Sequence, residues 1–325
     1  MFKYIITAII IALFAGCSAP KAKRAPLWYT TLPKDFNFIY ATAASTDEGK
    51  AKKLAIASLR TQINQELNSA FENRTSKLMI ESKKDIPLLE KSNEYLANTL
   101  SMRAVKIDKT AVFKGQTLIL VKFSRKSLFD ALSRSLNKRL PVSKKTFQDI
   151  TSNVAIKRFV VIQDLMKNYG RMASLIEAKK VAIPSYSTYD EFTYLNELKK
   201  SYTKLKHDIT LYVLSDVNSR AFTPAIKNAL RGTGLLLSSK SESKDALKVL
   251  ITSKTTNSQN YSFNQAKSLV KFTTYDINKK QVAFKQHTFI GKSRKSHKEA
   301  KQQSALHVSG KIRKLGIFNF LGLDK

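Results

Sequence analysis

Side chains able to do chemistry are few in this chain and stand far apart. There is one cysteine, Cys17, and there are four histidines. His297 and His307 are ten residues apart on a segment with a helical pattern, so they point from different faces and lie almost three turns apart. They could not share a metal ion, and no His-Glu-x-x-His motif accompanies them. We therefore expect no transition-metal site.

Serine and lysine recur at the Ser-x-x-Lys spacing that penicillin-binding enzymes use. The three instances begin at Ser135, Ser201 and Ser241. In a chain this rich in both residues the spacing is expected by chance, and no Lys-Thr-Gly or Ser-Asp-Asn partner is present. The scarce acids stand mostly at helix starts and turns, such as Asp47 and Glu48, which disfavours paired-carboxylate catalysis. The sequence predicts a protein that is not an enzyme.

The positive charge of the chain is its main compositional feature. Against 24 Asp and Glu stand 57 Lys and Arg, which gives a net charge of +33 over 325 residues. A hydrophobic fraction of 43% is ordinary for folded domains. Only 10 glycines and 7 prolines are present, so few phosphate-cradling loops are expected and nucleotide-binding enzymes are disfavoured.

Residues 1–16 have the pattern of a secretory signal peptide. Lys3 precedes an apolar run from Tyr4 to Phe14, and small residues follow immediately before Cys17. The run is shorter than the roughly 20 residues that cross a bilayer. With one cysteine, disulfides within the chain are excluded, and the thiol of Cys17 is free for another use.

The residues Leu13-Phe14-Ala15-Gly16-Cys17 resemble the lipobox of bacterial lipoproteins. The resemblance implies cleavage before Cys17, a diacylglycerol on its thiol and an acyl chain on its amine, with no other cofactor. Two or three acyl chains make anchoring effectively permanent. Ser18, where an Asp would signal retention in the inner membrane, implies the outer membrane, with the chain on its periplasmic face. Residues 17–25 are predicted to form the lipidated tether.

Residues 26–141 are predicted to form a first α+β domain. A strand over 36–43 is followed by a capping box, Ser45 to Glu48, and by a helix whose apolar residues recur every fourth position, widened by Leu54 and Ile56. A hairpin is expected over 103–123 around Lys114-Gly115, then a helix over 127–140 that Pro141 closes.

This first domain resembles the Lpp-twenty family of bacterial outer-membrane lipoproteins, which includes flagellum-associated members. The resemblance rests on Pro26-x-Trp28, Pro33, the aromatic strand and the Ala-rich helix, over roughly residues 24–140. It implies an envelope-facing structural or assembly role and brings no catalytic residues.

The rest of the chain divides into a helical segment and a second domain. Residues 142–206 show helical spacing broken at Pro184, which predicts an antiparallel helical hairpin. Residues 207–325 predict a second α+β domain of order β-α-β-β-β-β-α, in which three alternating runs over 246–256, 261–276 and 281–290 predict the long strands. The fold class expected is thus α+β, with two sheet-and-helix domains joined by the hairpin. The apolar tail 315–323 is predicted to be a last strand or core plug, with a docking segment as the alternative.

The cations are spread along the chain, which disfavours nucleic acid as the partner, since such sites gather charge on one face. The best candidate for a dedicated anion site is the C-terminal helix. Its cations are Lys295, Lys298, Lys301, Lys311 and Arg313.

The sequence therefore predicts an outer-membrane lipoprotein that serves as a non-catalytic structural or assembly component of the envelope, with a flagellar association allowed. Its expected partners are membrane lipid and envelope proteins or further copies of itself. Two alternatives stay open: binding of an anionic ligand such as lipopolysaccharide, peptidoglycan or DNA, and a cell-wall-modifying enzyme.

Overall fold

The computed structural model describes residues 24–75, 105–150, 154–239 and 246–324. It confirms the α+β class, with helices and two separate sheets. The chain divides into two compact units. The first holds the described residues up to Arg139 together with Gly170–Tyr189, and the second holds Leu140–Tyr169 and the chain from Asp190 onward.

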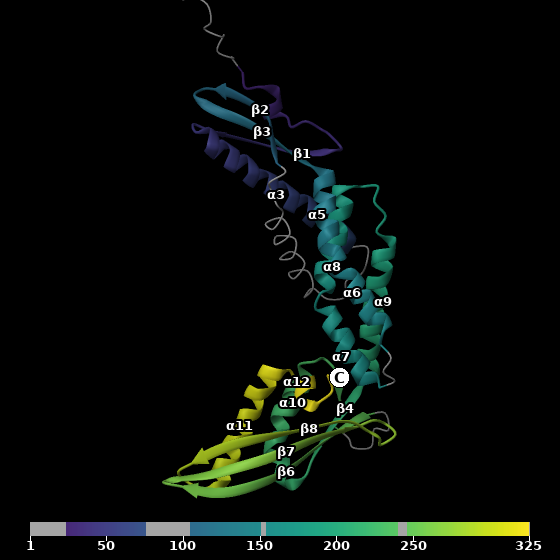
Figure 1. Cartoon of the computed structure of the whole chain (residues 1–325), viewed down its shortest axis with the longest axis vertical. Helices are drawn as coiled ribbons and strands as arrows, with labels where there is room; N and C mark the ends of the chain where they lie inside the picture. The colour runs from purple at the N-terminus through teal and green to yellow at the C-terminus, as the bar shows by residue number, and fades with distance from the viewer. Residues whose placement is uncertain (1–23, 76–104, 151–153, 240–245, 325) are drawn as a thin grey trace, which may run out of the picture. The chain divides into compact units, whose positions relative to one another are not determined.

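The first unit contains a three-stranded antiparallel sheet of order β1-β3-β2 (Figure 1). A short helix, α2 (Leu27–Thr30), precedes β1 (Phe38–Ser45), and the other strands are β2 (Lys106–Phe113) and β3 (Gln116–Ser124). The predicted hairpin turn is confirmed. Lys114 and Gly115 both have positive φ, 50° and 77°, which matches the right-handed twist of the two strands it joins.

Helix α3 (Glu48–Thr75) packs on β1 and β3 of this sheet. Its predicted stripe is confirmed over the described side chains, which are at most 2% exposed: Ala51, Ala55, Leu59, Ile63 and Leu67. Leu54 was expected to widen the stripe but is 45% exposed. The capping prediction was wrong by two residues. Asp47 is the N-cap, because its Oδ1 accepts the backbone N–H of Lys50 at 2.6 Å, while Ser45 is the last residue of β1.

Helix α5 (Arg125–Asn137) follows β3, capped by Ser124, whose hydroxyl accepts the N–H of Ser127. Helix α8 (Tyr169–Ala182) returns to this unit from farther along the chain, and the ring of Tyr186, just beyond it, meets Phe129 edge-on at 4.9 Å. Pro141 does not close α5 as predicted. It is the second residue of the next helix. Proline is tolerated there because the N–H groups of a first helical turn make no hydrogen bond within the helix.

The predicted hairpin segment, 142–206, contains more helices than two and is divided between the units. The second unit holds α6 (Leu140–Gln148), α7 (Ala155–Met166) and nearly all of α9 (Tyr189–Asp208). Aromatic contacts join them: Phe147 meets Tyr194 at 5.9 Å, and Phe159 stacks on Tyr202 at 5.5 Å. The apolar spacing therefore buries one face of each helix, as expected for packing.

The second unit is built on a five-stranded sheet of order β5-β4-β6-β7-β8. Strand β4 (Thr210–Ser215) runs parallel to β5 (Leu236–Leu237) and β6 (Ala246–Asn260), and β7 (Phe263–Tyr275) and β8 (Gln281–Ser293) continue antiparallel. Between β4 and β5 lie a 3-10 helix, η2 (Val217–Phe222), and α10 (Thr223–Arg231). The predicted order of elements is confirmed.

Helices α10, α11 (His297–Leu315) and α12 (Ile317–Leu321) lie on one face of this sheet (Figure 1). The apolar tail is a core plug, as predicted, although it is helical rather than extended. Phe320 and Leu321 are fully buried, and Phe320 meets Phe272 of β7 at 4.9 Å. The other face of the sheet carries no helix of the α10–α12 layer.

Candidate functional site

The predicted lipidation residue, Cys17, lies outside the described residues, as do the signal peptide and most of the tether. Among the helices that the structure describes, none is both long and apolar enough to cross a membrane. Lipidation of Cys17 stays a prediction.

The predicted cations of α11 do not gather in one place. Lys295 precedes the helix, Lys298 is in its first turn, and Arg313 is in its last, about 22 Å along the axis from Lys298. The amine of half-buried Lys311 lies over the ring of Phe289 at 5.6 Å, while Lys301 is half-buried elsewhere on the helix. The set therefore shares an element but makes no single pocket.

Lysines do gather on the face of the five-stranded sheet opposite the helix layer. On β7 the even-numbered residues from Ala266 to Thr274 are buried beneath the helices, so the odd-numbered ones face outward. We call the set of outward lysines on β6, β7 and β8 the lysine face. It comprises Lys248, Lys254, Lys267, Lys271 and Lys292, all exposed except half-buried Lys248.

The register places four of these lysines on consecutive diagonals. Lys254 pairs with Leu269 and so lies diagonal to both Lys267 and Lys271, and Lys267 pairs with Ile290, two residues from Lys292. Diagonal neighbours on one sheet face are about 8 Å apart. Strands β4 to β8 contain no Asp or Glu, so these charges repel one another with no carboxylate on the sheet to offset them.

Sequence reasoning missed the lysine face, although the signal was there. The three long strands were predicted, but the alternation within them was not used to ask which lysines share a side. The register was also needed, because it decides which lysines of different strands become neighbours.

The first unit has a different kind of site, a hollow of about 490 Å³ between the segment before β1 and the helices of the same unit. The side chain of Arg125 is fixed at its wall. Its Nη1 donates to the Val181 carbonyl at 2.8 Å, and its Nη2 lies 3.4 Å from the Glu66 carboxylate. Apolar lining comes from Leu32, Phe36 and Phe38. The hollow is therefore amphipathic.

A small polar network lies beside this hollow. The amine of Lys122 pairs with Asp108 at 2.6 Å and lies over the ring of Phe38 at 5.1 Å. The hydrogen bond to Asp108 raises the pKa of Lys122. Burial, followed by the carboxylates of Asp35 and Asp108, raises the pKa of Tyr40. Both shifts favour the forms present at neutral pH, so this network orients groups and activates no nucleophile.

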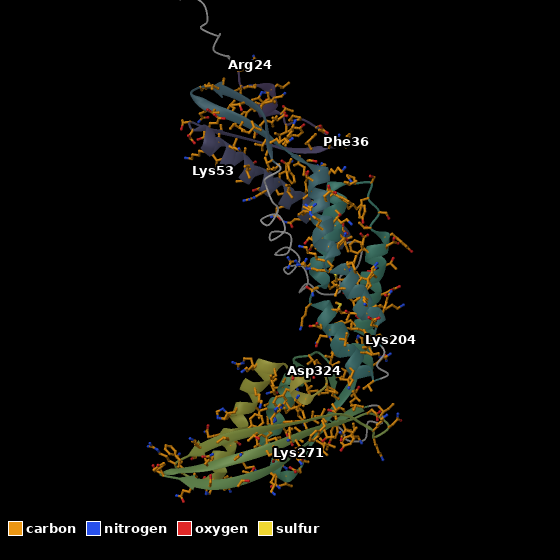
Figure 2. The ribbon with its side chains drawn as sticks, in the orientation of Figure 1. Arg24, Phe36, Lys53, Lys204, Lys271 and Asp324 are labelled. Atoms are coloured by element: carbon orange, nitrogen blue, oxygen red, sulfur yellow. The ribbon has the colours of Figure 1, made fainter. Side chains whose placement is uncertain are left out.

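Exposed apolar side chains mark the segment that links the tether to β1. Leu27 is 78% exposed and Phe36 is 95% exposed, and Leu32 lies between them at 36%. Phe36 is one of the residues that line the hollow, and Figure 2 labels it on the segment before β1. Leu27 and Phe36 are thus strongly exposed within ten positions of the sequence, and large apolar side chains exposed together are typical of a surface that contacts another molecule.

The histidines of the structure support no common chemistry. His287 is buried, and its Nε2 is 2.9 Å from the carbonyl oxygen of Phe320. Burial, with smaller contributions from Lys311 and Lys285, lowers its pKa. Within the described ranges, no three His, Cys, Asp or Glu side chains converge as a metal site would require.

Comparison with known proteins gives only weak structural matches. No family model and no curated protein matches this chain. Among solved structures, the secreted protein HP1454 from Helicobacter pylori is 14% identical with a TM-score of 0.37, over 86% of this chain and 98% of that one. A minor lipoprotein from Acinetobacter baumannii is 10% identical with a TM-score of 0.28, over 34% of this chain and 90% of that one. An envelope lipoprotein is compatible with both descriptions, but at these scores neither match carries an argument about function.

Proposed function

We propose that the protein is a lipid-anchored component of the outer membrane that works by binding envelope proteins and catalyses no reaction. The anchor is Cys17, in the lipobox context Leu13 to Cys17, and the Lpp-twenty resemblance of the first domain points the same way. The observation that carries the binding role is the exposed apolar segment Leu27, Leu32 and Phe36 beside the first-unit hollow. It directly follows the tether, where an anchored protein would meet other envelope components.

The anchor is tested by changing Cys17. In Cys17→Ser the chain takes up no labelled palmitate and leaves the membrane fraction, whereas the matched variant Ser18→Ala keeps both properties. Ser18→Asp tests the membrane assignment, because it should move the lipidated chain to the inner membrane on a density gradient. Palmitate uptake by Cys17→Ser would refute the lipobox interpretation.

The binding role is tested at Phe36. Crosslinking in whole cells is expected to join the wild-type chain to a discrete envelope protein, or to a second copy, and Phe36→Ser should lose that product. Tyr261→Ser is the matched control, since Tyr261 is an aromatic side chain of equal exposure, 96%, at a hairpin tip of the second unit. Loss of the crosslinked product in the Tyr261 variant but not the Phe36 variant would place the contact elsewhere.

A second candidate function, binding of an anionic envelope polymer, is favoured by the lysine face. The double variant Lys267→Gln and Lys271→Gln should weaken binding of purified lipopolysaccharide and flatten its salt dependence. The control removes two exposed charges of the originally predicted set, Lys298→Gln with Arg313→Gln. Equal weakening in both double variants would mean that only the net charge matters.

A further inference from the structure

A second cationic site lies in the second unit, apart from the lysine face. A hollow of about 400 Å³ opens beside η2 and α10, between the end of β4 and the side of the helix. Three cations line it, Arg220, Lys227 and Arg231. We call this set the cationic hollow. Its polar lining is completed by Ser215, Thr223 and Asn228.

The sequence explains why these cations share a side. Lys227 and Arg231 are four residues apart on α10, so they lie on the same side of the helix one turn apart, and Arg220 lies in the preceding 3-10 helix η2. The adjacent side of α10 carries Ile226 and Leu230, both fully buried against the unit. Packing of that apolar side leaves Lys227 and Arg231 at the edge of the helix that borders the hollow, where Arg220 of η2 joins them.

The cations of this hollow form no ion pair among the described residues, although the carboxylate of Asp216 directly follows the lining residue Ser215. None of the side chains that line the hollow is a carboxylate. Arg231 donates to the side-chain oxygen of Asn228 at 3.0 Å, which leaves its other N–H groups available and orients the guanidinium. Three cations around one concave space attract an anion of more than one charge.

The N-terminus of α10 adds a second favourable contribution. Thr223, the first residue of α10, and Pro224 both line the hollow. The helix dipole favours negative charge at this end of α10. The Oγ1 of Thr223 is itself shielded from solvent and has no hydrogen-bond partner among the described residues, so it lies behind the surface that a ligand would contact.

We propose that the cationic hollow binds a phosphate monoester group. A phosphate dianion offers several acceptor oxygens to the two guanidinium groups and to the Lys227 amine. The volume is within the range of small-ligand sites, about 300 to 1,000 Å³, so a phosphorylated small molecule or the phosphate of a lipid headgroup would fit. The site shares no residue with the lysine face or with the first-unit hollow, and it stands independently of the function proposed above.

The test is calorimetric titration of the Cys17→Ser chain, which carries no acyl group, with inorganic phosphate and with pyrophosphate at constant ionic strength. Saturable binding is expected, tighter for pyrophosphate. The double variant Arg220→Gln with Lys227→Gln should bind at least about tenfold more weakly, because it removes two charge-assisted contacts. The control is Lys204→Gln, which removes an exposed cation of α9 (Figure 2) that lines none of the hollows described above. This variant should leave the affinity unchanged.

Binding to lipid vesicles distinguishes a lipid headgroup from a soluble phosphorylated molecule as the ligand. If the ligand is a lipid headgroup, phosphatidylcholine vesicles that contain phosphatidic acid will bind the chain, vesicles without it will not, and the double variant will lose the difference. Binding of free phosphate or pyrophosphate without a response to phosphatidic acid assigns the site to a soluble phosphorylated molecule. Absence of binding in both arms, or binding that the double variant and Lys204→Gln weaken equally, overturns the proposal. Thr223→Val, which keeps the shape and all three cations, should leave the affinity unchanged, because the hydroxyl is shielded from the hollow.

Discussion

The two units solve the same packing problem with different residues. In each, a long helix must lie close against a sheet. In the first unit α3 approaches through alanines, Ala51 and Ala55, which are fully buried. In the second, β8 presents Gly291 to α11, where an added Cβ would lie 2.0 Å from the Ala300 carbonyl oxygen and 2.4 Å from the Ser304 nitrogen. One methyl group fits at the first contact, and none fits at the second.

The units also differ in how their cores are closed. The second unit ends in the α12 plug, whose Phe320 lies among Phe272, His287 and Phe289. The first unit is completed by α8, a segment from farther along the chain, through contacts such as that of Arg125 with the Val181 carbonyl. We therefore expect the second core to depend on α12 and the first core to depend on α8.

The largest expected effect is at the plug. Phe320→Ala should lower the free energy of unfolding of the second unit by about 4 kcal/mol, since a fully buried ring leaves a cavity. Leu59→Ala, at a fully buried position of α3, should cost the first unit about 3 kcal/mol. Hydrogen exchange resolved by peptide measures each unit separately. If Phe320→Ala speeds exchange in α3 as much as in β7, the two cores do not respond separately.

A smaller effect is expected where the second helix touches its sheet. Gly291→Ala should cost about 3 kcal/mol, because both clashing atoms belong to the backbone of α11 and cannot rotate away. The reciprocal change in the first unit, Ala55→Gly, should cost about 1 kcal/mol, mainly through helix propensity. Denaturant unfolding of the two variants provides the measurement. A neutral Gly291→Ala would show that the helix can shift outward.

The helix caps should be equivalent in the two units. Asp47→Ala at α3 and Ser296→Ala at α11 each remove one acceptor for a first-turn N–H, from Lys50 and Glu299 respectively. Each should cost about 1 kcal/mol. Ser45→Ala is the control at the residue first expected to cap α3. It should cost less, because Ser45 only accepts the N–H of Asp47 at 3.3 Å.

The smallest effect is a dependence of stability on pH that belongs to the second unit. Burial lowers the pKa of His287 below that of the unfolded chain, so the unfolded state binds more protons between the two values. Stability is then complete above the unfolded pKa, about 6.5, and falls as pH decreases from there toward the folded pKa. In the folded state the neutral ring donates its Nε2–H to the Phe320 carbonyl. His287→Gln should remove this slope from thermal unfolding curves, and an unchanged slope would assign it to another group.

Periodicity in the sequence predicted the elements but not their neighbours. The apolar residues that recur at every fourth position from Ala51 to Leu67 correctly predicted the buried face of α3. The alternating apolar runs correctly predicted the strands β6 to β8. Which residues become neighbours in space depends on the register of the strands and on the packing of α8 in the first unit. Neither can be predicted from a short stretch of sequence. The local errors have local causes. Pro141 begins a helix as readily as it ends one, and Asp47 outcompetes Ser45 because its carboxylate reaches the first turn.

A candidate site could be predicted only where its residues are consecutive in the sequence. Cys17 has a motif of five consecutive residues, so it could be singled out at once. The lysine face needs three strands in register, and the cationic hollow needs η2 and α10 to fold back on the end of β4. The α11 set failed to converge because one helix spreads cations along its axis and around its circumference.

The absence of Asp and Glu from the five-stranded sheet has a consequence for how this surface responds to its surroundings. Carboxylates titrate in moderately acidic water, whereas lysine side chains as a class titrate only in alkaline water. A face that holds lysines alone therefore has no partner charge to lose when the medium acidifies. The attraction of the lysine face for anions therefore persists when the pH falls. It weakens when the salt concentration rises, because dissolved ions screen the charges.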